Sequence, residues 1–139
     1  MPPADRYAVF GHPIGHSQSP RIHRLFAKQT GQTLTYTAED VTPEIFEPSV
    51  KAFLQTGGRG LNCTVPLKEL AFRLADTLRA RAQRSKAVNT LALRDDGMIF
   101  GENTDGVGLV RDLTHNLGLD LSGQRILILG AGGATRGIL

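Results

Sequence analysis

Short apolar runs alternate with amphipathic stretches along the chain. Residues 7–10 form a continuous apolar run followed by Gly11 and Pro13, a pattern typical of a buried strand. Further strands are predicted at 34–37, 60–65, 88–93, 98–100 and 126–129, and helices are predicted to begin near residues 19, 42 and 67 and to span about 76–85 and 104–117. This alternation predicts an α/β fold with a mainly parallel sheet and helices on both of its faces.

Capping and turn residues refine this pattern. Ser19 followed by Pro20 is typical of a helix N-cap and the first helical residue, and Gly31 is a C-terminal stop for that helix. The sequence Asp95-Asp96-Gly97 is typical of a hairpin turn. One strand of the sheet is therefore expected to be antiparallel.

Composition excludes several classes of protein. The 139 residues carry a formal net charge of +3, but with no Trp, only two Tyr and no long Lys/Arg block, nucleic-acid binding is not expected. The densest basic stretch, residues 79–86, is interpreted as a solvated helix face. No stretch approaches the roughly 18 apolar residues of a membrane span, and the N-terminus lacks a secretory signal pattern. We therefore expect a cytoplasmic protein without nucleic-acid or membrane partners.

Cysteine and histidine usage limits the metal and redox chemistry. Cys63 is the only cysteine, which excludes an internal disulfide framework and a multi-cysteine zinc site and favours a reducing compartment. His12 and His16 have no carboxylate or cysteine at ligand spacing, so no metal site is expected.

Two serines lie near the start of the first predicted helix. The hydroxyls of Ser17 and Ser19 can donate hydrogen bonds to a carboxylate there, and the helix dipole favours its negative charge. Ser19 has an equally good structural interpretation as the N-cap of the helix, whereas Ser17 has none.

A second polar cluster accompanies the third predicted strand. Asn62 and Thr64 face the same way in a strand because side chains alternate, and Lys68 lies in the first turn of the next helix. A lone lysine in such a place is usually solvent-exposed. Desolvation and a positive neighbourhood would also ease the loss of a proton from the ammonium, which favours a proton-donating role.

A third cluster contains Asn89 and Asp105. Asp105 lies in the first turn of the helix predicted at 104–117, where carboxylates are common for dipole reasons alone. Paired with Lys68, the carboxylate would instead hold the ammonium in position and help to pass a proton between a bound substrate and solvent.

The last predicted strand runs into the glycine-rich sequence GAGGATRG, residues 130–137. A strand, a glycine turn and a helix in this order suit a dinucleotide pyrophosphate at the helix N-terminus. The match to G-x-G-x-x-G is incomplete because Thr135 replaces the third glycine, and a P-loop is excluded because Ile138 replaces its lysine. Similar turns also occur without a nucleotide.

Taken together and in this order, these clusters resemble the shikimate dehydrogenase family. The matching stretches are GHPIGHSQSP, NCTVPLKELA, AVNT, ENTDGVG and GAGGATRG. Members of this family are two-domain oxidoreductases that reduce 3-dehydroshikimate to shikimate with NADPH, in the route to chorismate and the aromatic amino acids. The resemblance implies an α/β substrate domain followed by a Rossmann domain that binds NADP.

The resemblance also implies a role for individual residues. Ser17 and Ser19 would hold the substrate carboxylate, and Lys68 and Asp105 would contact the substrate as the catalytic pair. The ring hydroxyls would be held by Asn62, Thr64, Asn89 and Asp105, and the NADP loop would be formed by Gly130, Ala131, Gly132, Gly133 and Ala134.

The family pattern divides the chain into three parts. Residues 1–103 are expected to form the substrate-binding domain, 104–118 a connecting helix, and 119–139 the truncated start of the NADP-binding Rossmann domain. Because a dinucleotide fold needs further strands, we expect this chain alone to bind shikimate without turnover. The unpaired strand at 126–129 is expected to pack against another copy of the chain or to be mobile.

Two other functions remain open at this point: a quinate/shikimate dehydrogenase, which the paired Ser17 and Ser19 make less favoured, and a shikimate-binding module without turnover. Three positions depart from the family pattern. Cys63 replaces an aliphatic residue and is expected to pack in the core, Lys86 replaces a small residue, and Ala80 replaces an acidic residue.

Overall fold

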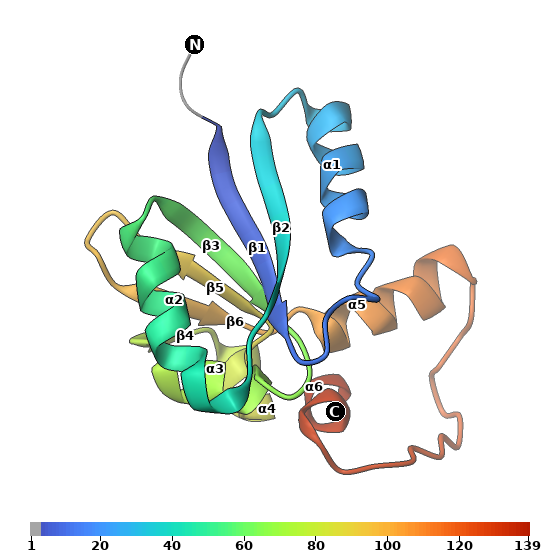
Figure 1. The fold of residues 1–139 in the computed structure, drawn as a ribbon. Helices are drawn as coiled ribbons and strands as arrows, with labels where there is room; N and C mark the ends of the chain where they lie inside the picture. The colour runs from blue at the N-terminus through green and yellow to red at the C-terminus, as the bar shows by residue number, and fades with distance from the viewer. Residues whose placement is uncertain (1–3) are drawn as a thin grey trace.

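A six-stranded sheet forms the centre of the fold (Figure 1). The computed structural model describes residues 4–139. The strands are β1 (Asp5–Gly11), β2 (Leu34–Asp40), β3 (Gly58–Cys63), β4 (Thr77–Leu78), β5 (Thr90–Leu93) and β6 (Ile99–Glu102), and their order in the sheet is β2-β1-β3-β5-β6-β4. β1 pairs in parallel with both β2 and β3, as expected of strands joined by helical connections.

Among the strands of residues 4–139, only β5 runs against its neighbours. It is antiparallel to both β3 and β6, whereas β4 and β6 are parallel. The turn between β5 and β6 contains Gly97 at a φ of +81°, a left-handed conformation that glycine adopts without steric cost. The predicted sheet, mainly parallel with one antiparallel hairpin strand, is confirmed.

Helices cover both faces of the sheet, as predicted. α1 (Ser19–Thr30) lies on β1 and β2, while α2 (Phe46–Gln55), α3 (Lys68–Leu74) and α4 (Ala80–Ser85) lie on the opposite face (Figure 1). A 3-10 turn, η1 (Pro43–Ile45), precedes α2. The chain then forms α5 (Asp105–Arg111), a π-helical turn, η2 (Asp112–Asn116), and α6 (Gly133–Ile138).

The alternation of side chains along β1 divides the core into two parts. Ala8 and Phe10 point to the face of α2 and α3, where they join a buried cluster that includes Phe46. Tyr7 and Val9 point to the other face, which α1 covers. Since burying a large apolar side chain contributes about 1.5–3 kcal/mol, the larger cluster under α2–α4 provides most of the hydrophobic stabilisation.

Residues 126–129 do not form the predicted strand. No strand among residues 4–139 pairs with them, and the side chains of Leu127 and Leu129 are exposed. A strand takes its backbone hydrogen bonds from a partner, so an apolar sequence is not sufficient by itself. The helix that follows the glycine turn, α6, does form and packs against α4 and α5.

Two smaller predictions are also wrong. The helix predicted at 76–85 is shorter, because Thr77 and Leu78 pair with β6 as the edge strand β4 and α4 begins only at Ala80. At the start of α1 the N-cap is Gln18 rather than Ser19. Ser19 is the first helical residue, so its hydroxyl does not serve as the cap.

Candidate functional site

The carboxyl ends of β1 and β3 meet at one edge of the sheet, and the antiparallel β5 begins at the same edge. Asn62, near the end of β3, is paired in register with Thr90 at the start of β5. Asn89, which precedes β5, therefore lies beside the residues that follow β3. An antiparallel strand thus brings its leading residues to the edge where parallel strands present their trailing ones.

A cavity of about 350 Å3 opens at this edge, and we refer to it as the edge cavity. Six of the predicted site residues line it, namely Ser19, Asn62, Thr64, Lys68, Asn89 and Asp105. Ser17 is adjacent, because its Oγ accepts a hydrogen bond of 3.3 Å from the backbone N–H of Ser19. The fold therefore gathers side chains that are widely separated in the sequence.

Lys68 and Asp105 form an ion pair at the edge cavity. Lys68 Nζ lies 2.7 Å from Asp105 Oδ2, and the two side chains are 26% and 33% exposed. Lys68 is the first residue of α3 and Asp105 the first of α5, so each is held by the backbone of a helix start. Partial exclusion of water makes such a pair stronger than one on an open surface, while leaving both groups within reach of a ligand.

Asn89 holds the second oxygen of the same carboxylate. Its Nδ2 donates to Asp105 Oδ1 at 2.9 Å and to Thr104 Oγ1 at 2.8 Å, and its Oδ1 accepts from the backbone N–H of Thr104 at 3.0 Å. Because an ionised carboxylate only accepts and a backbone N–H only donates, the orientation of this amide is fixed. Each oxygen of Asp105 then has one protein donor and retains a lone pair for a further donor.

Three polar side chains at this site were missed by the sequence reasoning, namely Tyr36, His23 and Thr104. Tyr36 Oη donates to Asn62 Oδ1 at 2.6 Å, and burial raises the pKa of this phenol, so it stays a protonated donor. The His23 ring stacks on Tyr36 with centroids 4.0 Å apart and also lines the edge cavity. The spacing of His23, one helical turn after Ser19, is the signal that could have found it.

The side chains of Cys63 and Thr64, at the end of β3, point to opposite sides of the strand. Thr64 packs against Gly11, where an added Cβ would lie 2.4 Å from Thr64 Cγ2, so the close approach of the two strand ends requires glycine. Cys63 points into the core on the opposite side, and burial raises the pKa of its thiol to about 12. The expectation that Cys63 packs rather than reacts is supported by this placement.

The glycine turn, residues 130–134, lies near Lys68, on the side away from the edge cavity. Gly132, Gly133 and Ala134 line a second cavity of about 330 Å3 together with Lys68, so Lys68 borders both cavities. Gly130 has a φ of +120°, which favours glycine. An added Cβ at Gly133 would lie 2.6 Å from Ala87 Cβ, so this turn can approach the segment that contains Ala87 only with a glycine there.

The helix after the turn is attached to the same region. Arg136 Nε donates to the carbonyl of Ser85 at 2.7 Å, and its Nη2 lies 3.1 Å from Glu69 Oε1. A glycine turn beside a helix start fits the pyrophosphate of a dinucleotide, which residues of this turn would hold and which would supply hydride chemistry. Gly130 and Ala131 are part of the turn but do not line the cavity beside Lys68.

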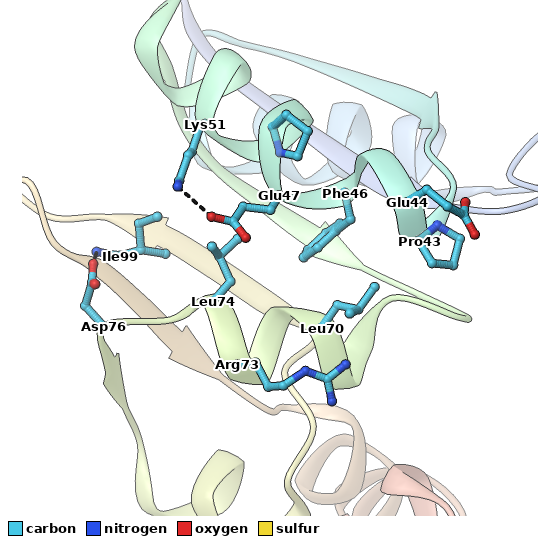
Figure 2. A pocket seen from close by; sticks show the side chains of 11 residues that line it. Pro43, Glu44, Phe46, Glu47, Lys51, Leu70, Arg73, Leu74, Asp76 and Ile99 are labelled. Carbon is cyan, nitrogen blue, oxygen red and sulfur yellow. Dashed lines mark hydrogen bonds and ion pairs between the residues drawn. The ribbon is translucent and has the colours of Figure 1, made fainter.

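A larger cavity of about 630 Å3 lies between η1, α2 and α3, with Phe46, Leu70 and Ile99 among its lining residues (Figure 2). We refer to it as the helix groove. None of its lining residues lines the edge cavity. Two of its charged groups pair with each other, because Lys51 Nζ lies 2.6 Å from Glu47 Oε1.

Residues 4–139 contain neither a metal-ligand cluster nor a helix that could span a membrane. No group of three or more His, Cys, Asp or Glu side chains in this part of the chain is arranged to hold a metal ion. None of its helices is long and apolar enough to cross a membrane.

Comparison with known proteins places this geometry in context. Residues 9–91 match the family model described as "Shikimate dehydrogenase substrate binding domain". The chain is 71% identical over its whole length to a shikimate dehydrogenase (NADP(+)) of Methylococcus capsulatus, of which it covers 50%. It is 59% identical to the same enzyme of Xylella fastidiosa strain M12, covering 98% of this chain and 48% of that protein.

Solved structures show the same similarity. An Ael1 enzyme from Pseudomonas putida superposes with a TM-score of 0.91 at 50% identity, covering 97% of this chain and 49% of that one. Shikimate 5-dehydrogenase of Thermus thermophilus, in complex with NADP(H) and shikimate, gives a TM-score of 0.88 at 40% identity, covering 96% of this chain and 50% of that one. The chain spans about half the length of the curated relatives it matches.

Proposed function

The chain belongs to the shikimate dehydrogenase family, and we propose that it provides the substrate site and the first part of the cofactor site of an NADP-dependent enzyme that interconverts 3-dehydroshikimate and shikimate. In this proposal residues 1–103 bind the substrate, residues 104–118 connect the two parts, and residues 119–139 begin the NADP-binding domain. The single observation that carries the proposal is the Lys68–Asp105 ion pair in a cavity lined by hydrogen-bonding side chains.

The substrate is proposed to lie in the edge cavity with its carboxylate at the start of α1. Ser17 and Ser19 would donate their hydroxyls to it, and the twelve-residue helix α1 would favour the negative charge at its N-terminus. Asn62, Thr64 and Asn89 would then meet the ring hydroxyls. A site built for hydroxyls discriminates strongly, because its polar groups remain unpaired when a hydroxyl is missing.

Lys68 is proposed to be the proton donor in the reducing direction. NADP(H), when held by the turn Gly130–Ala134, supplies or accepts the hydride. As negative charge develops on the ketone oxygen, Lys68 Nζ would stabilise it and deliver a proton. Asp105 would orient the ammonium through the 2.7 Å contact and accept a hydrogen bond from a ring hydroxyl with its remaining lone pair. In the oxidising direction, Lys68 would take the proton back.

The proposal is tested with a fusion in which this chain is joined to the part of the Methylococcus capsulatus relative that it does not match. We expect NADP-dependent oxidation of shikimate, and Lys68→Ala should lower kcat by about 10³-fold, within the range for loss of a general acid–base group. Lys51→Ala is the matched control, because Lys51 also contacts a carboxylate at 2.6 Å but lies at the helix groove. A Lys68→Ala variant within a few-fold of the parent would contradict the proposal.

The same fusion and the chain alone separate the alternatives. A shikimate-binding module without turnover predicts that the 139-residue chain binds shikimate, and NADP-dependent oxidation of shikimate by this chain alone would refute that alternative. A quinate/shikimate dehydrogenase predicts comparable turnover of quinate and shikimate. We also place the activity in the cytoplasm, which the buried free thiol of Cys63 fits because such thiols persist in reducing compartments.

A further inference from the structure

The buried polar residues of the described chain lie together. Among residues 4–139, the buried polar or charged residues are Ser85, Glu102 and Asn103. Ser85 ends α4, Glu102 ends β6, and Asn103 lies two residues before Asp105. Burying such groups is unfavourable unless they are hydrogen-bonded, so their concentration beside the Lys68–Asp105 pair calls for a physical reason.

Asn103 links two segments with its side-chain amide. Its Nδ2 donates to the carbonyl of Ala87 at 2.9 Å and to Ser85 Oγ at 3.1 Å, while its Oδ1 accepts from the backbone N–H of Asp105 at 3.0 Å. A carbonyl only accepts and a backbone N–H only donates, so the amide cannot be turned over without losing both bonds. The first residue of α5 is thereby tied to the segment 85–87.

The residue that follows this segment, Val88, contacts Lys68. The backbone N–H of Val88 donates to the carbonyl of Lys68 at 2.9 Å. Segment 85–88 therefore contacts Lys68 through the backbone and Asp105 through Asn103. The separation of the two backbones is fixed by these bonds in addition to the ion pair itself.

The side chain of Glu102 holds the backbone of Asn103. Its Oε1 accepts from the backbone N–H of Asn103 at 3.0 Å. Arg81 approaches the same carboxylate with Nε at 3.3 Å and Nη2 at 3.1 Å, a two-pronged contact that neutralises the buried charge. The backbone that carries the Asn103 amide is thus held independently of Lys68 and Asp105.

We propose that Asn103 is a positioning residue for the Lys68–Asp105 pair. Asn103 acts on the substrate only through Asp105. The inference rests on the proposed function. By accepting from the Asp105 N–H, Asn103 sets the start of α5 so that Asp105 Oδ2 meets Lys68 while the other lone pairs face the edge cavity. Removal of Asn103 leaves the Asp105 carboxylate present but misplaced relative to Lys68 and to a ring hydroxyl.

The test is a double-mutant cycle on shikimate affinity, measured by NMR titration of the 139-residue chain. Asn103→Ala should weaken shikimate binding about tenfold. This is a typical effect of losing one charge-assisted hydrogen bond, here the bond between the misplaced Asp105 carboxylate and a ring hydroxyl. In an Asp105→Ala background the same substitution should have no further effect, because Asn103 acts through Asp105. A purely structural role predicts instead that the two losses multiply, which would overturn the proposal. Asn116→Ala is the control, since Asn116 is exposed and its Nδ2 donates to Asp112 Oδ1 at 2.7 Å.

A second readout does not depend on the substrate. The Nζ–H signal of Lys68 in ¹⁵N–¹H spectra should be visible in the parent and in Asn116→Ala, because the ion pair shields it from exchange, and should be lost in Asn103→Ala. Retention of the signal in Asn103→Ala would contradict the inference. Failure of the parent chain to bind shikimate would count against the proposed function, while this signal still decides the role of Asn103.

Ser85→Ala provides a milder substitution if Asn103→Ala does not fold. It removes one acceptor of the Asn103 amide and leaves the bond to the Ala87 carbonyl in place. We expect about a threefold loss of shikimate affinity, absent in the Asp105→Ala background. An unchanged affinity for shikimate in a folded Ser85→Ala chain would contradict the inference that the hydrogen bonds of Asn103 position Asp105.

Discussion

The edge cavity and the helix groove each contain a lysine in contact with a carboxylate, yet they differ in how the pair is made. In the helix groove, Lys51 and Glu47 are one turn apart on α2, and their side chains are 56% and 59% exposed. In the edge cavity, Lys68 and Asp105 come from two helices that the sheet brings together, and they are about half as exposed. The groove has the larger volume, about 630 Å3 against 350 Å3.

This difference shows that neither the volume of a cavity nor an ion pair is by itself sufficient to identify a site. An i, i+4 pair follows from helix geometry alone and stabilises a helix by only about 0.3–0.5 kcal/mol. A pair assembled from distant segments needs other contacts to hold it, and Asn89 and Asn103 supply them around Asp105. Such supporting hydrogen bonds distinguish the edge cavity from the helix groove.

The largest effect is expected from neutralising the carboxylate in each pair. In the fusion enzyme, Asp105→Asn should lower kcat by about 10³-fold, because the amide no longer holds the Lys68 ammonium for proton transfer. Glu47→Gln should change kcat less than twofold. Steady-state kinetics with shikimate and NADP+ measure both, and similar losses in the two variants would show that the comparison is wrong.

The next effect separates stability from binding. Phe46 contributes to the wall of the helix groove and is 2% exposed, so Phe46→Ala should lower the free energy of unfolding by about 3 kcal/mol. The affinity for shikimate should stay within twofold of the parent in the folded protein. Urea denaturation and NMR titration of the 139-residue chain measure the two quantities, and a large loss of affinity would mean that the groove contributes to the site.

The smallest effect concerns the core beneath the edge cavity. The pKa of the Cys63 thiol is raised to about 12 in the folded chain, so the unfolded chain loses this proton first as the pH rises. Stability should be nearly independent of this group below about pH 8 and fall as the pH rises above about 8.5–9, by roughly 1.4–2 kcal/mol at pH 10. The stability difference between the parent and Cys63→Ala should shrink by that amount between pH 7 and pH 10. A stability difference that does not change with pH would show that the thiol is exposed to solvent and that its pKa is not raised.

Much of the fold could be predicted from the sequence where local patterns were sufficient. The apolar run at residues 7–10 and the turn at Gly97 are found where they were expected. The strand at 126–129 was not, because its hydrogen bonds depend on a partner that the local pattern does not describe. Lys86 has a φ of +50°, a left-handed conformation at the end of α4, which gives a physical reason to expect a small residue such as glycine there.

The candidate site shows a similar division. Lys68 and Asp105 could be predicted from their places at helix starts together with the family resemblance, and the structure pairs them. Tyr36 and His23 were missed, because a tyrosine in a strand and a histidine in a helix have no local mark of function until the two elements meet. The contact of Tyr36 with Asn62 depends on the order of the strands, which no short motif specifies.

The most direct test of the central claim is to map bound shikimate on the 139-residue chain by NMR, from chemical-shift changes and intermolecular NOEs. We expect chemical-shift changes at Ser17, Ser19 and Asn62 and contacts of the ring with Lys68, while the residues of the helix groove stay unaffected. Changes centred on Phe46 and Leu70, with Lys68 and Asp105 unperturbed, would contradict this claim.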